Sequence, residues 1–250
     1  MLISECFGPT LQGEGHFIGQ KSIFIRTCGC DYKCSWCDTK YAWEAGQATE
    51  MTPVEVFNAV IKLSGLYNCS HVVITGGNPC IIGDEMRALI ELLKEQHFHI
   101  TIETQGSIWQ DWLKLVDHVV LSPKPPSSRV KTNWAVLGKI RDRLYSEHHD
   151  QNTYSIKVVV FDDNDYQYSK DVFEFFEDHN YTGLYLQVGN IYANVPEPTN
   201  SKYVLPSTAY IKLLEKLEWL ANKVVADKDM NEVRVLPQLH TLIWGNRRGV

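Results

Sequence analysis

The 250-residue sequence lacks the features that mark several special classes of protein. It has no uncharged apolar run of about 18 residues, so we expect no membrane-spanning helix and no membrane partner. Residues 1–6 show no basic segment leading into an apolar stretch, so we expect no secretory signal. Repeats and low-complexity segments are also missing. The composition, 44% hydrophobic and 22% charged, is that of an ordinary globular protein.

Positive charge is scarce as well, since 24 lysines and arginines face 30 acidic residues for a net charge of −6. Proteins that bind nucleic acid usually carry a basic stripe, and we expect no nucleic-acid partner here. Seven cysteines are too few for a disulfide scaffold of this length. Their odd number, without a signal segment, indicates a reducing compartment and thiols that bind metal or react. We therefore expect a cytoplasmic protein.

Short β-rich runs alternate with helical patterns along the chain. Thr52 and Glu55 form a capping box at the start of one helix, and Asp84 is expected to cap the next. Strands are expected at 22–26, 71–75, 100–103, 118–121, 156–161 and 184–188, and helices at 53–64, from 84 onward, 109–116, 163–177 and 208–226.

About six β–α units imply mostly parallel strands with right-handed crossovers. The sequence therefore predicts an α/β fold, a partial (β/α)6 barrel formed by one domain over residues 1–250. A doubly wound sheet is the alternative. An irregular insertion is expected near 189–207, and a C-terminal helix with a tail over 208–250.

Chemically rich loops follow five of the expected strands, at residues 26–30, 75–79, 103–106, 122–126 and 187–190. β/α barrels assemble their active sites from the loops at the carboxyl ends of the strands. This arrangement favours an enzyme over a scaffold.

The most specific pattern is three cysteines in one loop, Cys30, Cys34 and Cys37. Thiolates select zinc or iron–sulfur clusters. A structural zinc site normally takes four ligands, and the fourth would have to be Cys28 or a distant group such as Cys6. Three ligands around a four-iron cluster instead leave one iron open for chemistry. The spacing favours the cluster, and a zinc-binding interaction protein is the alternative.

This cysteine spacing resembles the signature of the radical S-adenosylmethionine (SAM) superfamily. The resemblance implies a [4Fe–4S] cluster on the three cysteines, SAM on the open iron, and a partial β/α barrel. Further segments resemble the 7-carboxy-7-deazaguanine synthase family of the queuosine pathway: residues 7–15 (FGPTLQGEG), Arg26, 37–39, 76–79, 122–126 and 238–246.

The second resemblance implies a lyase that converts 6-carboxy-5,6,7,8-tetrahydropterin to 7-carboxy-7-deazaguanine with loss of ammonia. It also implies Mg²⁺ as a further cofactor, a homodimer, and a one-electron donor such as a flavodoxin or ferredoxin. Another radical SAM enzyme, such as one that installs a glycyl radical, is the alternative within this class.

The same resemblance assigns roles to individual residues. The three cysteines carry the cluster and are the catalytic residues, and Thr39 is the ligand of Mg²⁺. SAM is expected to contact Trp36, Cys37, Asp38, Gly77, Ser122, Pro123 and Lys124, and the pterin is expected to contact Leu11, Gln12, Gly13, Arg26 and Thr75.

Several of these residues have plainer interpretations from the sequence alone. From the sequence alone, Gln12 and Glu14 are typical of a solvated turn. Arg26 is typical of an ion-pairing arginine, and its guanidinium could also bind a carboxylate through two hydrogen bonds. Asn78 stands where many relatives have glutamate, so only main-chain groups of that loop are expected to serve SAM. The histidines lack metal-motif spacing, and we expect His97 and His99 at the surface or at the edge of a helix.

Overall fold

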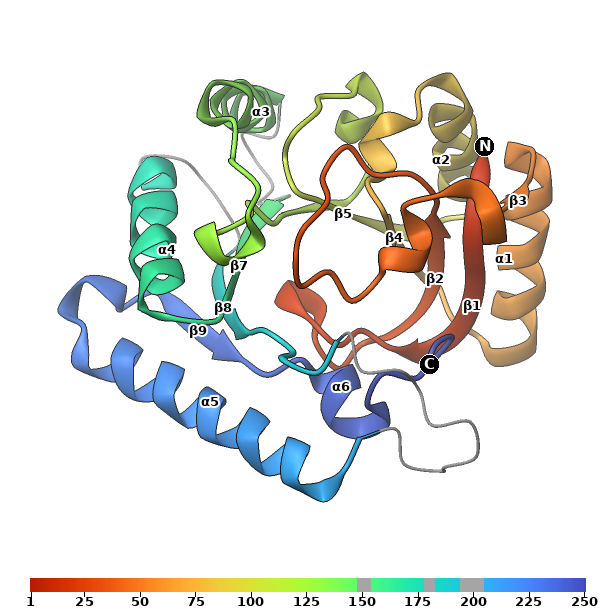
Figure 1. Ribbon diagram of the computed structural model, residues 1–250. Helices are drawn as coiled ribbons and strands as arrows, with labels where there is room; N and C mark the ends of the chain where they lie inside the picture. The colour runs from red at the N-terminus through yellow and green to blue at the C-terminus, as the bar shows by residue number, and fades with distance from the viewer. Residues whose placement is uncertain (148–153, 178–182, 194–204) are drawn as a thin grey trace.

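Nine strands in the described part of the chain form one curved sheet in the computed structural model (Figure 1). The structure describes residues 1–147, 154–177, 183–193 and 205–250. The strands are β1 (Leu2–Leu11), β2 (Lys21–Thr27), β3 (Thr49–Glu50), β4 (His71–Gly76), β5 (His99–Thr104), β6 (His118–Leu121), β7 (Tyr154–Val160), β8 (Leu184–Val188) and β9 (Val233–Leu236). Their order is β3-β1-β2-β4-β5-β6-β7-β8-β9.

The sheet is mostly parallel, as the sequence predicts. Every neighbouring pair from β2 to β9 is parallel, whereas β1 runs antiparallel to both β2 and β3. The six predicted strands correspond to β2 and β4–β8. The sheet is open between its edges β3 and β9, so the fold is a partial barrel.

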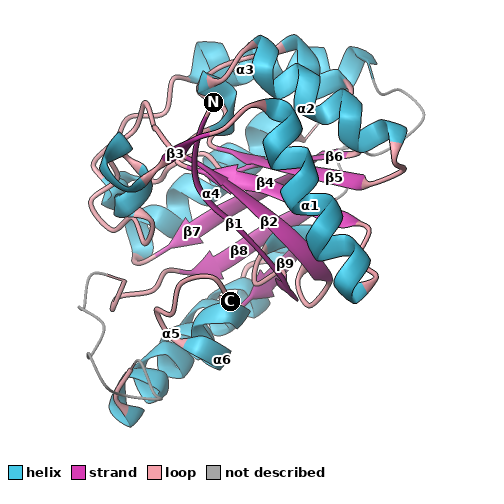
Figure 2. Cartoon of the chain, turned by 90° about the vertical axis from the view of Figure 1, so that its right-hand side faces the viewer, coloured by secondary structure: helices cyan, strands magenta, loops and turns pink. Residues whose placement is uncertain are grey.

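Helices cover the outside of this sheet (Figures 1 and 2). They are α1 (Pro53–Tyr67), α2 (Asp84–Glu95), α3 (Trp134–Glu147), α4 (Asp163–Phe176) and α5 (Ser207–Ala226), whereas the short α6 (Leu239–Trp244) lies at the cavity. The predicted capping box of α1 is confirmed, because Thr52 and Glu55 bond each other's backbone N–H. No helix in the described residues is long and apolar enough to cross a membrane.

Three helix predictions need correction. Gly83 is the N-cap residue of α2, and Asp84 lies in the first turn. The stretch 109–116 forms only a 3-10 helix, Asp111–Lys114, because the short connection from β5 to β6 must also bury Trp112 and Leu113. Helix α3 was not predicted, although three fully buried residues mark its inner face, Leu137, Ile140 and Leu144.

Most of the expected insertion, 194–204, lies outside the described residues.

The two faces of the strands differ in chemistry, and this difference creates the site. Alternate residues such as Ile25, Ile74 and Ile102 pack outward into the main hydrophobic core under the helices. Because side chains alternate along a strand, their neighbours point into the barrel. Several of these inward residues are polar or charged, including Glu103 and Lys157.

A cluster of rings closes the barrel at the amino ends of the strands. Phe17, in the 3-10 helix η1 (Gly15–Phe17), lies 4.9–5.3 Å from the rings of His71, His99 and His118. His16 stacks on His118 at 4.8 Å. The expectation that His99 lies at the surface or at the edge of a helix is therefore wrong, while His97 is exposed as expected. Position 99 points inward because it alternates along β5 with Ile100 and Ile102, which pack outward into the core.

Two of these histidines stay neutral in the folded protein. Burial, together with the charge of neighbouring histidines, lowers the pKa of His118 to about 3 and that of His71 to about 4. Each remains hydrogen bonded in its neutral form, His118 to Ser155 at 2.9 Å and His71 to Ser22 at 2.7 Å.

We expect the apoprotein to lose thermal stability as the pH falls from about 7.5 to about 5, and His118→Gln to lose less. The unfolded histidine takes up a proton near pH 6.5, whereas the folded one does not. The free energy of unfolding therefore falls by up to about 1.4 kcal/mol per pH unit for each such histidine below that pH.

Thermal unfolding measured by circular dichroism across this range checks the prediction. His97→Asn, which changes an exposed histidine, serves as the matched control and should keep the wild-type pH dependence. An equal loss of stability in His118→Gln and wild type would show that His118 is not the group responsible.

Candidate active site

A cavity of about 440 Å³ opens at the carboxyl ends of the strands, inside the curve of the sheet. Its size is in the range of sites that bind small molecules. One wall comes from the loop after β2, which carries the three cysteines, and the opposite wall comes from β5, β7 and the residues after β1. Helix α6 and residues 245–250 line the side where the sheet is open.

The structure brings nearly all of the predicted site residues into this one cavity. Those that line it are Leu11, Gln12, Gly13, Arg26, Cys30, Cys34, Trp36, Cys37, Asp38, Thr39, Thr75, Gly77, Ser122 and Lys124. Pro123 is buried behind the lining and does not contribute to it. Cys28 is also buried away from the cavity.

The cysteine loop is tied to the loops after β4 and β6. Ser35 donates its N–H to the carbonyl of Ser128 at 2.9 Å, and Trp36 Nε1 donates to Ser127 Oγ at 2.9 Å. Asn78 is fully buried, and its amide donates to Asp31 at 2.8 Å. The side chain of Asn78 therefore holds the cysteine loop in place, a role that the sequence analysis did not assign to it.

Gly76 and Gly77 are required by this close packing. A Cβ on Gly77 would lie 1.9 Å from the carbonyl oxygen of Gly29, and one on Gly76 would lie 2.3 Å from that of Thr27. Gly76 also has a φ of +132°, which favours glycine. Close packing against the neighbouring chain therefore accounts for both glycines.

The three thiols have the donor set and the room for an iron–sulfur cluster. All three cysteines are free, and backbone N–H groups point at two of the sulfurs, from Tyr32 to Cys30 and from Thr39 to Cys37, each at 3.4 Å. Such N–H···S bonds are typical of the surroundings of metal-bound thiolates. Burial and then the charge of Asp38 raise the pKa of Cys37 to about 11, so the site favours thiolates only when a cation balances them.

The three sulfurs are not arranged as in a tetrahedral zinc site. Tetrahedral Zn–S bonds of about 2.3 Å would place the sulfurs about 3.8 Å from one another. Among the described residues, the three cysteines do not form a group whose ligand atoms all lie within 4.8 Å of one another. The arrangement fits a larger group held by three thiolates, with no fourth thiol in the described lining of the cavity.

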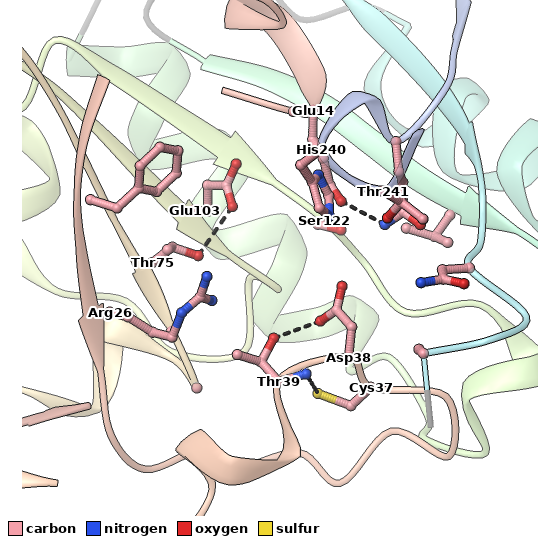
Figure 3. Close-up of a pocket in the computed structure, with 18 of the residues that line it drawn as sticks. Glu14, Arg26, Cys37, Asp38, Thr39, Thr75, Glu103, Ser122, His240 and Thr241 are labelled. Atoms are coloured by element: carbon pink, nitrogen blue, oxygen red, sulfur yellow. Dashed lines mark hydrogen bonds between the residues drawn. The ribbon is translucent and has the colours of Figure 1, made fainter. Parts of the chain in front are cut away.

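The wall opposite the cysteines is a network of buried charges, and Figure 3 shows its two carboxylates, Glu14 and Glu103. Lys157 on β7 is 4% exposed and forms ion pairs with Glu14 and, at 3.7 Å, with Glu103. Glu103 also accepts hydrogen bonds from Gln12 at 3.0 Å and Thr75 at 3.1 Å. The carboxylates of Glu14 and Glu103 and the ammonium of Lys157 thus connect residues from β4, β5, β7 and the end of β1.

Glu14 stays ionised in this network. Burial alone would raise its pKa, but the charges of Lys157 and His240 and a 2.6 Å hydrogen bond from Gln238 lower it to about 2. The pKa of Lys157 is raised, because its two carboxylate partners outweigh the effect of burial. The wall therefore presents fixed donors and acceptors for a polar, flat ligand.

Oxygen ligands for a divalent cation lie between the two walls. The Thr39 hydroxyl donates to Asp38 at 2.5 Å, and Figure 3 shows both side chains at the cavity. Asp38, Glu14 and His240 also bring their ligand atoms within 4.8 Å of one another. Arg26 points toward the same space.

Sequence reasoning missed several residues of this site. Lys157 carried a usable signal, because it is a charged residue within a mostly apolar strand, and so did Glu103, because polar and apolar residues alternate along β5. Gln238 and His240 lay in a segment noted for its resemblance but were given no role. Their partners are more than 200 residues away in the sequence, so spacing could not pair them.

Comparisons with known proteins agree with the site. Residues 24–134 match the model of the Radical SAM superfamily. A 7-carboxy-7-deazaguanine synthase from Bacillus cereus is 44% identical over 99% of this chain and 98% of its own length. The protein of the same name from Bacillus subtilis is 45% identical with the same coverage.

Solved structures are similar as well. The crystal structure of QueE from Escherichia coli superposes with a TM-score of 0.61 at 26% identity, covering 96% of this chain and 94% of that one. SuiB from Streptococcus suis, bound to its precursor peptide SuiA, gives a TM-score of 0.60 at 12% identity, which shows a shared fold. It covers 88% of this chain and 49% of its own.

We expect Lys157→Met to lower the free energy of unfolding of the apoprotein by about 3 kcal/mol at neutral pH, because Glu14 and Glu103 then lose their buried counter-charge. Urea unfolding measures this loss. Adding Glu14→Gln to Lys157→Met should recover part of it, since one of the two unbalanced carboxylates is gone. A loss below about 1 kcal/mol, or no recovery in the double variant, would contradict the charge balance.

Proposed function

The chain belongs to the 7-carboxy-7-deazaguanine synthase family of radical SAM enzymes, and we propose that its cavity takes 6-carboxy-5,6,7,8-tetrahydropterin as the substrate. The product is 7-carboxy-7-deazaguanine, and ammonia is lost. The observation that carries this proposal is the pairing of two walls in one cavity, three free thiols on one side and a preorganised set of carboxylates and amides on the other.

Cys30, Cys34 and Cys37 would hold a [4Fe–4S] cluster. When bound, the cluster and SAM together supply the one-electron chemistry of the reaction. The chain itself shields this centre, because Cys34 is buried, Cys30 and Cys37 are partly buried, and the loops after β4 and β6 hold the cysteine loop in place. Exclusion of water and oxygen is the contribution expected of a protein around such cofactors.

SAM would lie along the loops next to the cysteines. Trp36, Asp38, Gly77, Ser122 and Lys124 line this part of the cavity, and Pro123 supports it from behind. Lys124 Nζ donates to Ser122 Oγ at 3.2 Å and lies 5.9 Å from the Trp36 ring. An ammonium, a hydroxyl and an aromatic ring together suit a ligand with a carboxylate and an adenine base.

The pterin would lie against the charged wall. The edge of a pterin presents alternating hydrogen-bond donors and acceptors, and Gln12, Glu14 and Glu103 offer both kinds of partner. Leu11, Gly13 and Thr75 complete this wall. Arg26 would bind the substrate carboxylate through its two terminal nitrogens, because its Nε is already bonded to Glu5 at 3.1 Å.

Mg²⁺ would bind between Thr39 and the substrate oxygens, with Asp38 beside it. Magnesium prefers oxygen ligands and usually keeps several waters, which suits a hydroxyl and an exposed carboxylate at the edge of the cavity. We further propose that the protein works as a homodimer in the cytoplasm and receives electrons from a flavodoxin or ferredoxin.

Replacing Cys30, Cys34 or Cys37 by alanine should abolish both the visible absorbance of the cluster and product formation, whereas Cys28→Ala should keep both. The reason is that Cys28 is buried away from the cavity. Anaerobic assays with SAM, a reductant and carboxytetrahydropterin, read by mass spectrometry, check this. Release of deoxyadenosine without deazaguanine from the wild type would point to a different radical SAM reaction, and loss of the cluster in Cys28→Ala would refute the assignment of ligands.

Thr39→Ala should raise the Mg²⁺ concentration for half-maximal turnover by about tenfold or more, because the hydroxyl ligand is lost. Thr39→Ser keeps the hydroxyl and should need nearly the wild-type concentration. Turnover measured against Mg²⁺ concentration compares the three proteins. An unchanged requirement in Thr39→Ala would show that Thr39 is not a ligand.

A further inference from the structure

The carboxylate of Glu5 joins three parts of the chain just behind the cavity. Its Oε1 accepts a 2.8 Å hydrogen bond from Arg248 Nε. Its Oε2 accepts from Arg26 Nε and from the Tyr41 hydroxyl, each at 3.1 Å. Glu5 lies on β1, is 15% exposed at its side chain, and does not line the cavity. It touches the site only through these partners.

All three partners of Glu5 line the cavity. Arg26 stands at the carboxyl end of β2, and Tyr41 lies four residues after Cys37 on the loop that carries the cysteines. Arg248 belongs to residues 245–250, here called the strap, which cross the open side of the sheet and line the cavity along their whole length. Figure 1 shows the end of the strap beside β1.

The contact between the strap and the cysteine loop is close. The Arg248 guanidinium lies 3.7 Å from the centre of the Tyr41 ring, within the range of a cation–π contact. The hydroxyl of the same ring donates a 3.1 Å hydrogen bond to Glu5. One carboxylate and one ring therefore hold Arg248 from two directions.

The other end of the strap is fixed to the opposite side of the opening. Asn190, just after β8, donates to the side-chain oxygen of Asn246 at 2.9 Å, and Asn246 donates to the carbonyl of Tyr192 at 2.8 Å. The strap thus runs from the β8 side, through Asn246, to the β1 side, through Arg248. It spans the gap that the partial barrel leaves open.

We propose that Glu5 is a positioning residue for the reaction: it orients Arg26 toward the substrate and, through Arg248, latches the strap across the open side of the cavity. Two guanidinium groups share its two oxygens, so the same carboxylate sets the direction of Arg26 and the closure of the strap. Arg248 is the latch. The inference rests on the proposed function only for the identity of the substrate.

Two measurements on the cluster-loaded enzyme test this role. Glu5→Gln keeps the size of the side chain but removes the charge that both arginines share. We expect it to raise the KM for carboxytetrahydropterin by about tenfold with kcat changed less than about threefold, because substrate binding is lost in ground and transition states alike. Hydrogen exchange of the peptide that contains the strap should speed up by about tenfold or more.

Arg248→Met should speed exchange of the strap to a similar extent, with a smaller rise in KM, because Glu5 still holds Arg26. Arg248 is partly exposed, so this variant is expected to fold even if Glu5→Gln does not. Because both changes break the same latch, Arg248→Met in the Glu5→Gln background should alter KM less than about twofold. Glu91→Gln, in the exposed Arg87–Glu91 pair on α2, is the matched control and should behave as wild type.

If the strap exchanged hydrogen at the wild-type rate in either variant, the latch would be refuted. The latch would also be refuted if the increases in KM of the two single variants multiplied in the double variant. An unchanged KM in a folded Glu5→Gln protein would overturn the positioning of Arg26. Failure of the proposed function can be told apart from failure of this inference. A wild-type protein that makes no deazaguanine would refute the function, while hydrogen exchange of the strap would still test the latch.

Discussion

The ammonium group of Lys157 allows the inside of this sheet to hold two carboxylates, and the substrate wall depends on it. Both Glu14 and Glu103 pair with it, and without it Glu14 would lose the main counter-charge that keeps it ionised in a buried position. Gln12 and Thr75 are in turn oriented by Glu103. The hydrogen-bonding groups of the wall are therefore fixed before any ligand binds, which is the condition for selective recognition of a polar ring.

The two walls of the cavity supply different kinds of ligand groups. The cysteine loop supplies soft ligands and is held by backbone packing against Gly76 and Gly77, where no side chain would fit. The opposite wall supplies hard, charged groups on strands, whose positions the sheet fixes. An open barrel suits this division, because the cavity can be closed by separate elements, α6 and the strap, and need not be sealed by further strands. The ring cluster around Phe17 closes the other end.

Much of the fold could be predicted because the parallel strands are short apolar runs between recognisable helix signals, such as the capping box of Thr52 and Glu55. Strand β1 escaped notice since Gly8 and Pro9 interrupt its pattern and its register shifts there. The cysteine spacing and the family motifs indicated the contents of one wall. The other wall, Lys157 with Glu14 and Glu103, is formed by residues from distant parts of the chain, and only the folded sheet shows that they meet.

The most direct measurement is the iron and acid-labile sulfide content of protein purified without oxygen. Three thiolates holding one cluster predict about four irons and four sulfides per chain, with visible absorbance that bleaches on reduction. Colourless protein that contains zinc and no sulfide would contradict the account, because the cavity would then lack the centre around which both walls are arranged.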